Sequence, residues 1–154
     1  MSKIPDFMNL IKSWETSTRP SWNEFFICHA YLASSRSSCS RLHVGCVLVK
    51  NNRIVSEGYN GFITGEKHKS FVSIGSDNKE HEMATVHAEQ NAICYGANTG
   101  ISLGGTIAYI THYPCINCAK ILESCGITIV YYHEDYNNDP IIPKVCTRMI
   151  IEKI

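Results

Sequence analysis

The spacing of apolar and polar residues predicts one helix and one hairpin in the first part of the chain. A Ser-x-x-Glu capping pattern and apolar residues at helical spacing predict a helix over 21–36. Two apolar runs rich in β-branched residues, 44–49 and 54–59, flank the turn-forming pair 51–52 and predict an antiparallel hairpin. Residues 1–20 are mixed in character, and we expect them to form a short arm.

The second part of the chain alternates between helical and strand patterns. Residues 81–97 predict a long helix, with Thr85 as an alternative start. Strands are predicted at 106–111 and 127–132, with a helix at 115–125 between them that a proline precedes and a glycine follows. A strand–helix–strand unit implies parallel strands, so we expect an α/β fold with a mixed sheet and helices on its faces.

Two segments have no regular pattern. Residues 62–80 are rich in glycine, serine and charge and predict a long loop, and such loops are often functional. Residues 137–140 form a turn pattern, Pro143 disfavours a regular helix from Pro140, and 145–154 fits a helix or a strand. The length of 154 residues favours a single domain over 1–154.

The amino-acid composition limits the classes of function that the chain can have. Hydrophobic residues make up 44% and charged residues 18%, as in ordinary compact proteins. With 14 basic and 14 acidic residues, the chain lacks the basic surplus of proteins that grip a nucleic acid, although a small anionic ligand needs only a local cluster. We find no signal peptide and no membrane span in the sequence, so we expect a cytoplasmic protein, or one in the host cytoplasm if it is viral. In that compartment the eight cysteines are expected to be reduced thiols or metal ligands.

Two short motifs carry the candidate chemistry. His87, Cys115 and Cys118 offer the three protein ligands that a catalytic zinc keeps when its fourth position is open for water. Glu89 could then carry protons beside that water, and the small Ala88 would let the chain approach a ligand closely. His-x-Glu followed by Pro-Cys-x-x-Cys is the signature of zinc-dependent nucleobase deaminases.

The chemistry that fits is hydrolytic removal of an exocyclic amine. Zinc makes hydroxide available near pH 7, and Glu89 would pass the water proton to the ring nitrogen and the leaving amine. A redox Cys-x-x-Cys pair or a structural zinc site is the alternative. A structural site would need Cys94 or Cys125 as fourth ligand, but both occupy apolar helix positions.

Longer motifs resemble one family over about residues 20–140. The motifs are Arg36-Ser37-Ser38-Cys39, Val44-Gly45, Gly58-Tyr59-Asn60-Gly61, His87-Ala88-Glu89-Gln90-Asn91-Ala92, the run 111–120 and Asp135-Tyr136. They resemble deoxycytidylate (dCMP) deaminases of the cytidine deaminase superfamily, and bacterial late-competence-operon deaminases especially. The resemblance implies a three-layer α/β/α fold and zinc-dependent conversion of dCMP to dUMP, the precursor of thymidylate. It also implies a homohexamer, activation by dCTP and inhibition by dTTP, with Mg²⁺ accompanying a triphosphate effector.

The resemblance also implies roles for individual residues. By motif position, zinc would be held by His87, Cys115 and Cys118, Glu89 would transfer protons, and the substrate would contact Arg36, Asn60, Ala88 and Tyr136. Arg36 would meet the phosphate, Asn60 the sugar, and Tyr136 would close over the nucleotide. The alternatives are a solvated helix end for Arg36 and a simple turn residue for Asn60. Some relatives bind a second zinc, for which Cys39, His68 and His81 are the candidates here, and surface histidines are the alternative.

Other functions share parts of this pattern. Dual use of dCMP and dCTP fits the same motifs. A tRNA adenosine deaminase shares the metal motifs but needs a basic face for the phosphate backbone. A zinc-binding or partner-binding module without catalysis would not need Glu89.

Overall fold

A five-stranded mixed sheet forms the centre of the computed structural model, which describes residues 4–16, 19–75, 78 and 80–154. Its strands, in the spatial order β2-β1-β7-β8-β9, are β1 (Gly45–Lys50), β2 (Arg53–Tyr59), β7 (Ile107–His112), β8 (Ile129–Glu134) and β9 (Ile150–Lys153). β1 runs antiparallel to both β2 and β7, whereas β7, β8 and β9 are parallel. The predicted hairpin and the predicted parallel crossover are therefore confirmed.

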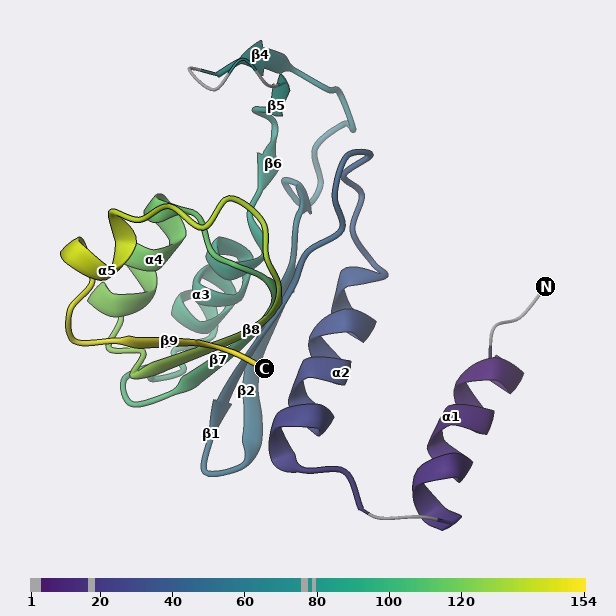
Figure 1. The fold of residues 1–154 in the computed structure, drawn as a ribbon. Coiled ribbons are helices and arrows are strands. Elements are labelled where there is room, and N and C mark those ends of the chain that lie inside the picture. The colour runs from purple at the N-terminus through teal and green to yellow at the C-terminus, as the bar shows by residue number, and fades with distance from the viewer. Residues whose placement is uncertain (1–3, 17–18, 76–77, 79) are drawn as a thin grey trace.

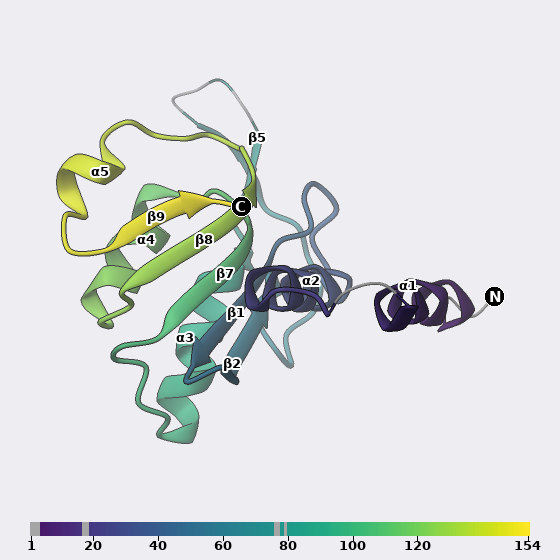
Figure 2. The same ribbon diagram turned by 60° about the horizontal axis from the view of Figure 1, so that its bottom comes forward.

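Helices cover both faces of the sheet (Figures 1 and 2). Helix α2 (Trp22–Ser34) lies on one face, and α3 (Ala88–Thr99), α4 (Ile116–Ser124) and the short α5 (Ile142–Val145) lie on the other. The fold is thus the expected three-layer α/β/α arrangement.

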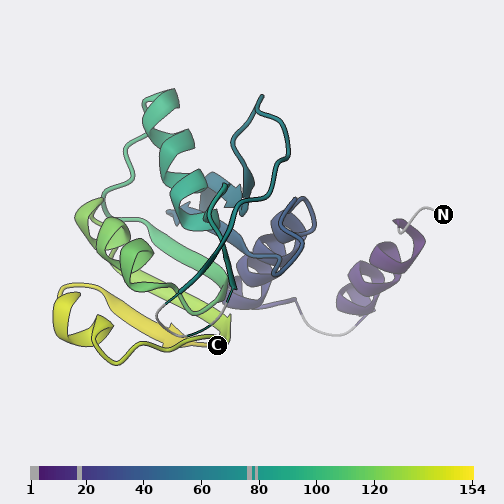
Figure 3. The ribbon, with the colours of Figure 1, turned by 90° about the horizontal axis from the view of Figure 1, so that it is seen from above.

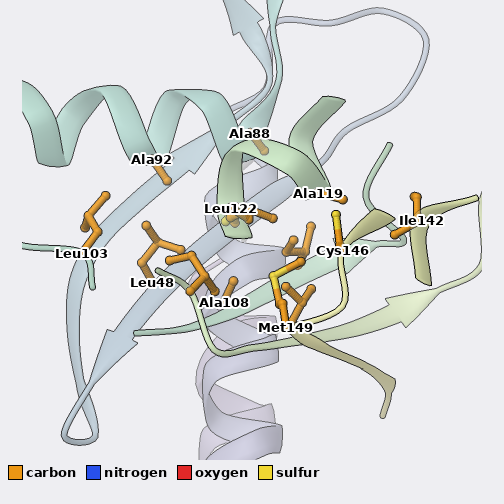
Figure 4. Close-up of a cluster of buried hydrophobic side chains, with 14 residues drawn as sticks. Leu48, Ala88, Ala92, Leu103, Ala108, Ala119, Leu122, Ile142, Cys146 and Met149 are labelled. Carbon is orange, nitrogen blue, oxygen red and sulfur yellow. The ribbon is translucent and has the colours of Figure 1, made fainter. Parts of the chain in front are cut away.

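Alternate residues of β1 belong to two separate cores. Val47 and Val49 pack with Phe26 in the core beneath α2. Cys46 and Leu48 belong to the larger core beneath α3 and α4, part of which is drawn in Figure 4. A strand buried on both faces needs a continuous apolar run, which is the pattern that the sequence has here. The turn after this strand uses Asn51 and Asn52 with positive φ of 51° and 57°, the conformation that a tight hairpin requires.

Gly58 lets β2 and α3 touch through their backbones. A Cβ atom added there would lie 2.4 Å from the Ala88 carbonyl oxygen and 2.4 Å from the Ala92 nitrogen. The backbone of α3, whose first turn carries the candidate chemistry, is therefore seated directly against the sheet.

We expect Gly58→Ala to lower the melting temperature of the protein. Forcing a methyl group into a filled space costs about 1–3 kcal/mol, which in a chain of this size lowers the melting temperature by about 2–12 °C. Gly104→Ala is the matched control, because an added Cβ there meets no atom within 4 Å. A thermal scan of both variants tests this, and a Gly58→Ala protein as stable as the wild type would contradict the close approach.

The expected start of the second long helix, at 81 or near Thr85, is wrong. Helix α3 begins only at Ala88, because His87 is its extended N-cap with φ −72° and ψ 155°. The preceding residues form the short strands β5 (Glu80–Glu82) and β6 (Thr85–Val86). These pair with β4 (Val72–Ile74) and β3 (Gly61–Phe62), so the expected loop over 62–80 contains strands. Residues 76–77 and 79 of that loop lie outside the described residues.

The ends of the chain also differ from expectation. Instead of a short arm, the N-terminal segment contains α1 (Ile4–Thr16), which stands apart from the sheet in Figures 1, 2 and 3. Residues 1–3 and 17–18 of the expected arm lie outside the described residues. At the C-terminus, the segment that fitted helix or strand is β9, an edge strand of the sheet. In the described part of the chain, no helix has both the length and the apolar character needed to cross a bilayer.

Candidate metal centre and its cavity

Two helix N-termini meet at the candidate metal centre. His87 is the N-cap of α3 and Cys115 is the N-cap of α4, both with extended backbone. The His87 N–H donates to Gln90 Oε1 at 3.1 Å, and the Cys118 N–H donates to Cys115 Sγ at 3.5 Å. These local bonds hold both ends so that the side chains of the two caps lie close together.

The three donors fit a single zinc ion. His87 Nδ1 lies 3.6 Å from Cys115 Sγ and 3.5 Å from Cys118 Sγ. A tetrahedral zinc, with bonds of about 2.0 Å to nitrogen and about 2.3 Å to sulfur, would hold such atoms about 3.5 Å apart. All three ligand atoms lie within 4.8 Å of one another, and no further group of His, Cys, Asp or Glu of this kind exists among the described residues. The site therefore offers three protein ligands, as expected for a zinc with an open position.

The electrostatics of the two thiols also suit a cation. Hydrogen bonds from Cys118 and His87 lower the pKa of the Cys115 thiol to about 4, so it is a thiolate at neutral pH. The hydrogen bond to that thiolate, together with burial, raises the pKa of Cys118. A cation would let both sulfurs carry their charge at once. All eight cysteines lie in the described part of the chain and have free thiols, so none is held in a disulfide.

Glu89 lies in the first turn of α3 and is 4% exposed. Burial raises the pKa of its carboxyl group above the ordinary value. Its oxygens do not belong to the three-donor group formed by the neighbouring histidine and cysteines. A carboxyl group with a raised pKa, beside a metal centre but not part of it, is suited to accept and return protons.

A cavity of about 710 Å³ opens onto this centre. His87, Ala88, Glu89 and Cys115 line one part of it, so a ligand in the cavity reaches two of the three metal donors and the carboxyl group. Other walls come from the segment after α2, from the β4–β5 hairpin and from the loop after β8, which carries Tyr136. Tyr136 is 48% exposed, and its predicted contact with the nucleotide stays a prediction.

Asn60 lines the cavity but also holds the segment after α2. Its Oδ1 accepts hydrogen bonds from Ser37 Oγ at 2.8 Å and from the Val44 N–H at 2.8 Å. Its Nδ2 donates to the Leu42 carbonyl at 2.7 Å. Asn60 is thus a clamp on residues 37–44, and its predicted contact with the sugar remains a prediction.

The remaining predicted site residues are not gathered at the metal centre. Arg36 is exposed just beyond α2 and does not line the cavity, so its predicted phosphate contact stays a prediction. Cys39 and His81 line the cavity, whereas His68 stacks on Phe62 with ring centroids 4.8 Å apart. Within the described residues, these three donors do not form a second metal-binding group, and the structure gives no support to a second zinc there.

Arg41 and His112 are among the cavity-lining residues that the sequence analysis did not identify as site residues. Thr111 Oγ1 accepts the Gly45 N–H at 3.1 Å, so its hydroxyl can donate to His112 Nδ1, 2.9 Å away. With Thr111 as the donor, the ring proton of His112 is on Nε2; burial lowers the pKa of His112, which favours the neutral ring. Position next to the Pro-Cys-x-x-Cys motif could have identified His112. Arg41 lies between the helix expected over 21–36 and the strand expected from 44, and none of the motifs includes it.

Comparisons with known proteins agree with this geometry. The model of the family described as "Cytidine and deoxycytidylate deaminase zinc-binding region" matches residues 20–134. ComE operon protein 2 of Bacillus subtilis is 41% identical over 125 residues, which cover 79% of this chain and 64% of that protein. The deoxycytidylate deaminase of Schizosaccharomyces pombe is 36% identical over 128 residues, covering 79% of this chain and 39% of the relative.

One solved structure is similar to this chain over most of the length of the chain. The crystal structure of dCMP deaminase from the cyanophage S-TIM5, in complex with dCMP and dUMP, has a TM-score of 0.74 and 31% sequence identity. The match covers 90% of this chain and 100% of the phage chain. The matched region thus spans less than two thirds of the Bacillus and yeast relatives but all of the phage enzyme.

Proposed function

The chain belongs to the family of cytidine and deoxycytidylate deaminases, and we propose that it converts dCMP to dUMP by hydrolytic deamination. The family resemblance inferred from the motifs is thereby confirmed. One observation carries the proposed activity: a group of three metal donors, two of which line the cavity, lies beside a buried carboxyl group that lines the same cavity. The nucleotides named for the phage structure support dCMP as the first substrate to test.

His87, Cys115 and Cys118 would hold the zinc, and Glu89 would move the protons. A zinc ion held there would supply the Lewis acidity that lets water ionise near neutral pH. Glu89 takes a proton from the water whose oxygen bonds to C4 of the cytosine ring, and delivers that proton to ring nitrogen N3. The C4–N4 bond then breaks, the amine leaves as ammonia after a further proton transfer through Glu89, and the uracil ring remains. His112 lines the same cavity, and in the tautomer with its proton on Nε2 the ring would have an N–H to offer the bound nucleotide.

Further parts of the proposal rest on family resemblance. These are supply of the thymidylate precursor, activation by dCTP and inhibition by dTTP, Mg²⁺ bound with a triphosphate effector, a homohexamer and a cytoplasmic location. Sedimentation of the purified protein with and without dCTP tests the hexamer and the effector together.

We expect the protein to form dUMP from dCMP with a kcat/KM at least about tenfold above that for deoxycytidine, because a bound phosphate adds charge-assisted hydrogen bonds. Product formation is measured side by side for dCMP, dCTP, deoxycytidine and cytidine with the zinc-loaded protein. Equal turnover of dCTP would indicate dual use. Fastest turnover of cytidine, or no uracil product from any substrate, would contradict the proposal.

A further inference from the structure

We propose that Asp135 is a positioning residue: together with Lys153 and Asn138, it holds the loop of residues 135–139 in the shape that binds the substrate. This inference rests on the proposed function, because the nucleotide is the ligand that the loop would contact. The loop follows β8, and three of its residues line the cavity: Tyr136, Asn137 and Asp139. The match of the family model ends at residue 134, so all three proposed positioning residues lie beyond the matched region.

An ion pair ties the loop to the edge of the sheet. Lys153 Nζ donates to Asp135 Oδ2, and Lys153 is the last residue of β9. Strand β9 lies beside β8 (Figure 2), and Lys153 is in register with Tyr132, near the end of β8. The hydrogen bond from Lys153 lowers the pKa of the Asp135 carboxyl group below its ordinary value, so this group is a carboxylate at neutral pH. The first residue of the loop is therefore fixed to a strand other than the one that it follows.

Asn138 extends this contact from the carboxylate to the backbone of the loop. Its Nδ2 donates to Asp135 Oδ1 at 2.7 Å, and its Oδ1 accepts the Tyr136 N–H at 3.2 Å. The Tyr132 hydroxyl donates to the same Asp135 Oδ1 at 3.4 Å. The Tyr132 ring also meets the ring of Tyr113, a cavity-lining residue, edge-on with centroids 4.9 Å apart. The Asp135 carboxylate thus gathers donors from β8, from β9 and from the loop, and the bond through Asn138 holds the backbone that carries Tyr136.

The exposed position of Tyr136 makes these bonds important. Because Tyr136 is 48% exposed, packing holds it only in part, and its place on the cavity wall depends on its backbone. The other end of the loop is held separately, since Asp139 Oδ1 accepts the Ile141 N–H at 3.0 Å and the Asp139 carbonyl accepts the Ile142 N–H at 3.1 Å. A loop that is ordered before the ligand arrives loses less conformational freedom on binding, which favours affinity. Breaking the contacts of Asp135 should therefore weaken nucleotide binding without touching the metal donors.

We expect Asp135→Ala to raise the KM for dCMP and the Kd for dUMP by about five- to twentyfold, because the loop must then be ordered on binding. Its kcat should stay within about twofold of the wild type, since the metal donors and Glu89 lie on other elements. Steady-state kinetics with the zinc-loaded protein give KM and kcat, and calorimetry with dUMP gives the affinity without turnover.

Further variants separate the contacts of the carboxylate. Asn138→Ala keeps the ion pair but removes the bond to the Tyr136 backbone, and it should also raise the KM and the Kd. Lys153→Met should raise both constants by a smaller factor, whereas Lys153→Arg keeps a cationic donor and should behave as the wild type. Lys144→Met is the matched control, because Lys144 is an exposed lysine on α5, and it should leave both constants unchanged.

Amide hydrogen exchange of the ligand-free protein tests the loop separately. The segment 135–139 should exchange faster in Asp135→Ala than in the wild type, while α3 and α4 should exchange as before. Unchanged exchange of this segment, or an unchanged Kd for dUMP in Asp135→Ala, would overturn the inference, and so would a loss confined to kcat. A wild type that binds dUMP but deaminates no substrate would contradict the proposed function, while the comparison of dUMP affinities would still test the loop. The melting temperature of each variant identifies any loss caused by misfolding.

Discussion

Replacing Glu89 with glutamine is expected to lower kcat for dCMP by about 10²–10⁴-fold, the usual contribution of a positioned acid–base group. The amide has nearly the shape of the carboxyl group but cannot take a proton from water. Because Glu89 does not belong to the three-donor group, zinc content should stay near one ion per chain. Single-turnover kinetics and metal analysis on the same preparation measure both effects.

Glu57→Gln is the matched control, since Glu57 is an exposed carboxylate on β2. It should leave both kcat and metal content unchanged. Full turnover by Glu89→Gln would leave a zinc-binding module without catalysis as the better interpretation. Loss of zinc from Glu89→Gln would mean instead that the carboxylate is a ligand.

The sequence predicted those parts of the fold that depend on local patterns. Three features could be predicted from neighbouring residues alone: the apolar run of β1, the turn at the two asparagines that follow it, and the helix between β7 and β8. The candidate metal donors were also predictable, because His-x-Glu followed by Pro-Cys-x-x-Cys is a pattern of a few neighbouring residues in each motif.

The features that the sequence did not predict depend on contacts between residues that are distant along the chain. Helix α3 starts at Ala88 because Thr85 and Val86 pair with Gly61 and Phe62, more than twenty positions earlier. The place of Arg41 in the cavity likewise depends on the Asn60 clamp and on a carbonyl of the β4–β5 hairpin. Neither contact leaves a periodic signal in the sequence.

Removing one thiolate should abolish both metal binding and activity. In Cys118→Ser, a neutral hydroxyl replaces the buried sulfur, and two protein ligands remain for zinc. We expect zinc content to fall from near one ion per chain to near zero after dialysis, and dUMP formation from dCMP to fall below detection. Cys94→Ser is the matched control, because Cys94 is an exposed thiol on α3 outside the three-donor group.

Zinc loss should also reduce stability, because an ion that binds only the folded state stabilises that state. Free zinc at a thousandfold excess over its dissociation constant contributes about 4 kcal/mol, so a chelator should lower the melting temperature of the wild type by about 8–16 °C. The same chelator should barely change that of Cys118→Ser, whose site is already broken. If Cys118→Ser kept one zinc per chain with wild-type affinity, the ion would have to be held by donors other than these three. The assignment of the three ligands would then be wrong, and so would the inference that the open fourth position of the zinc faces Glu89.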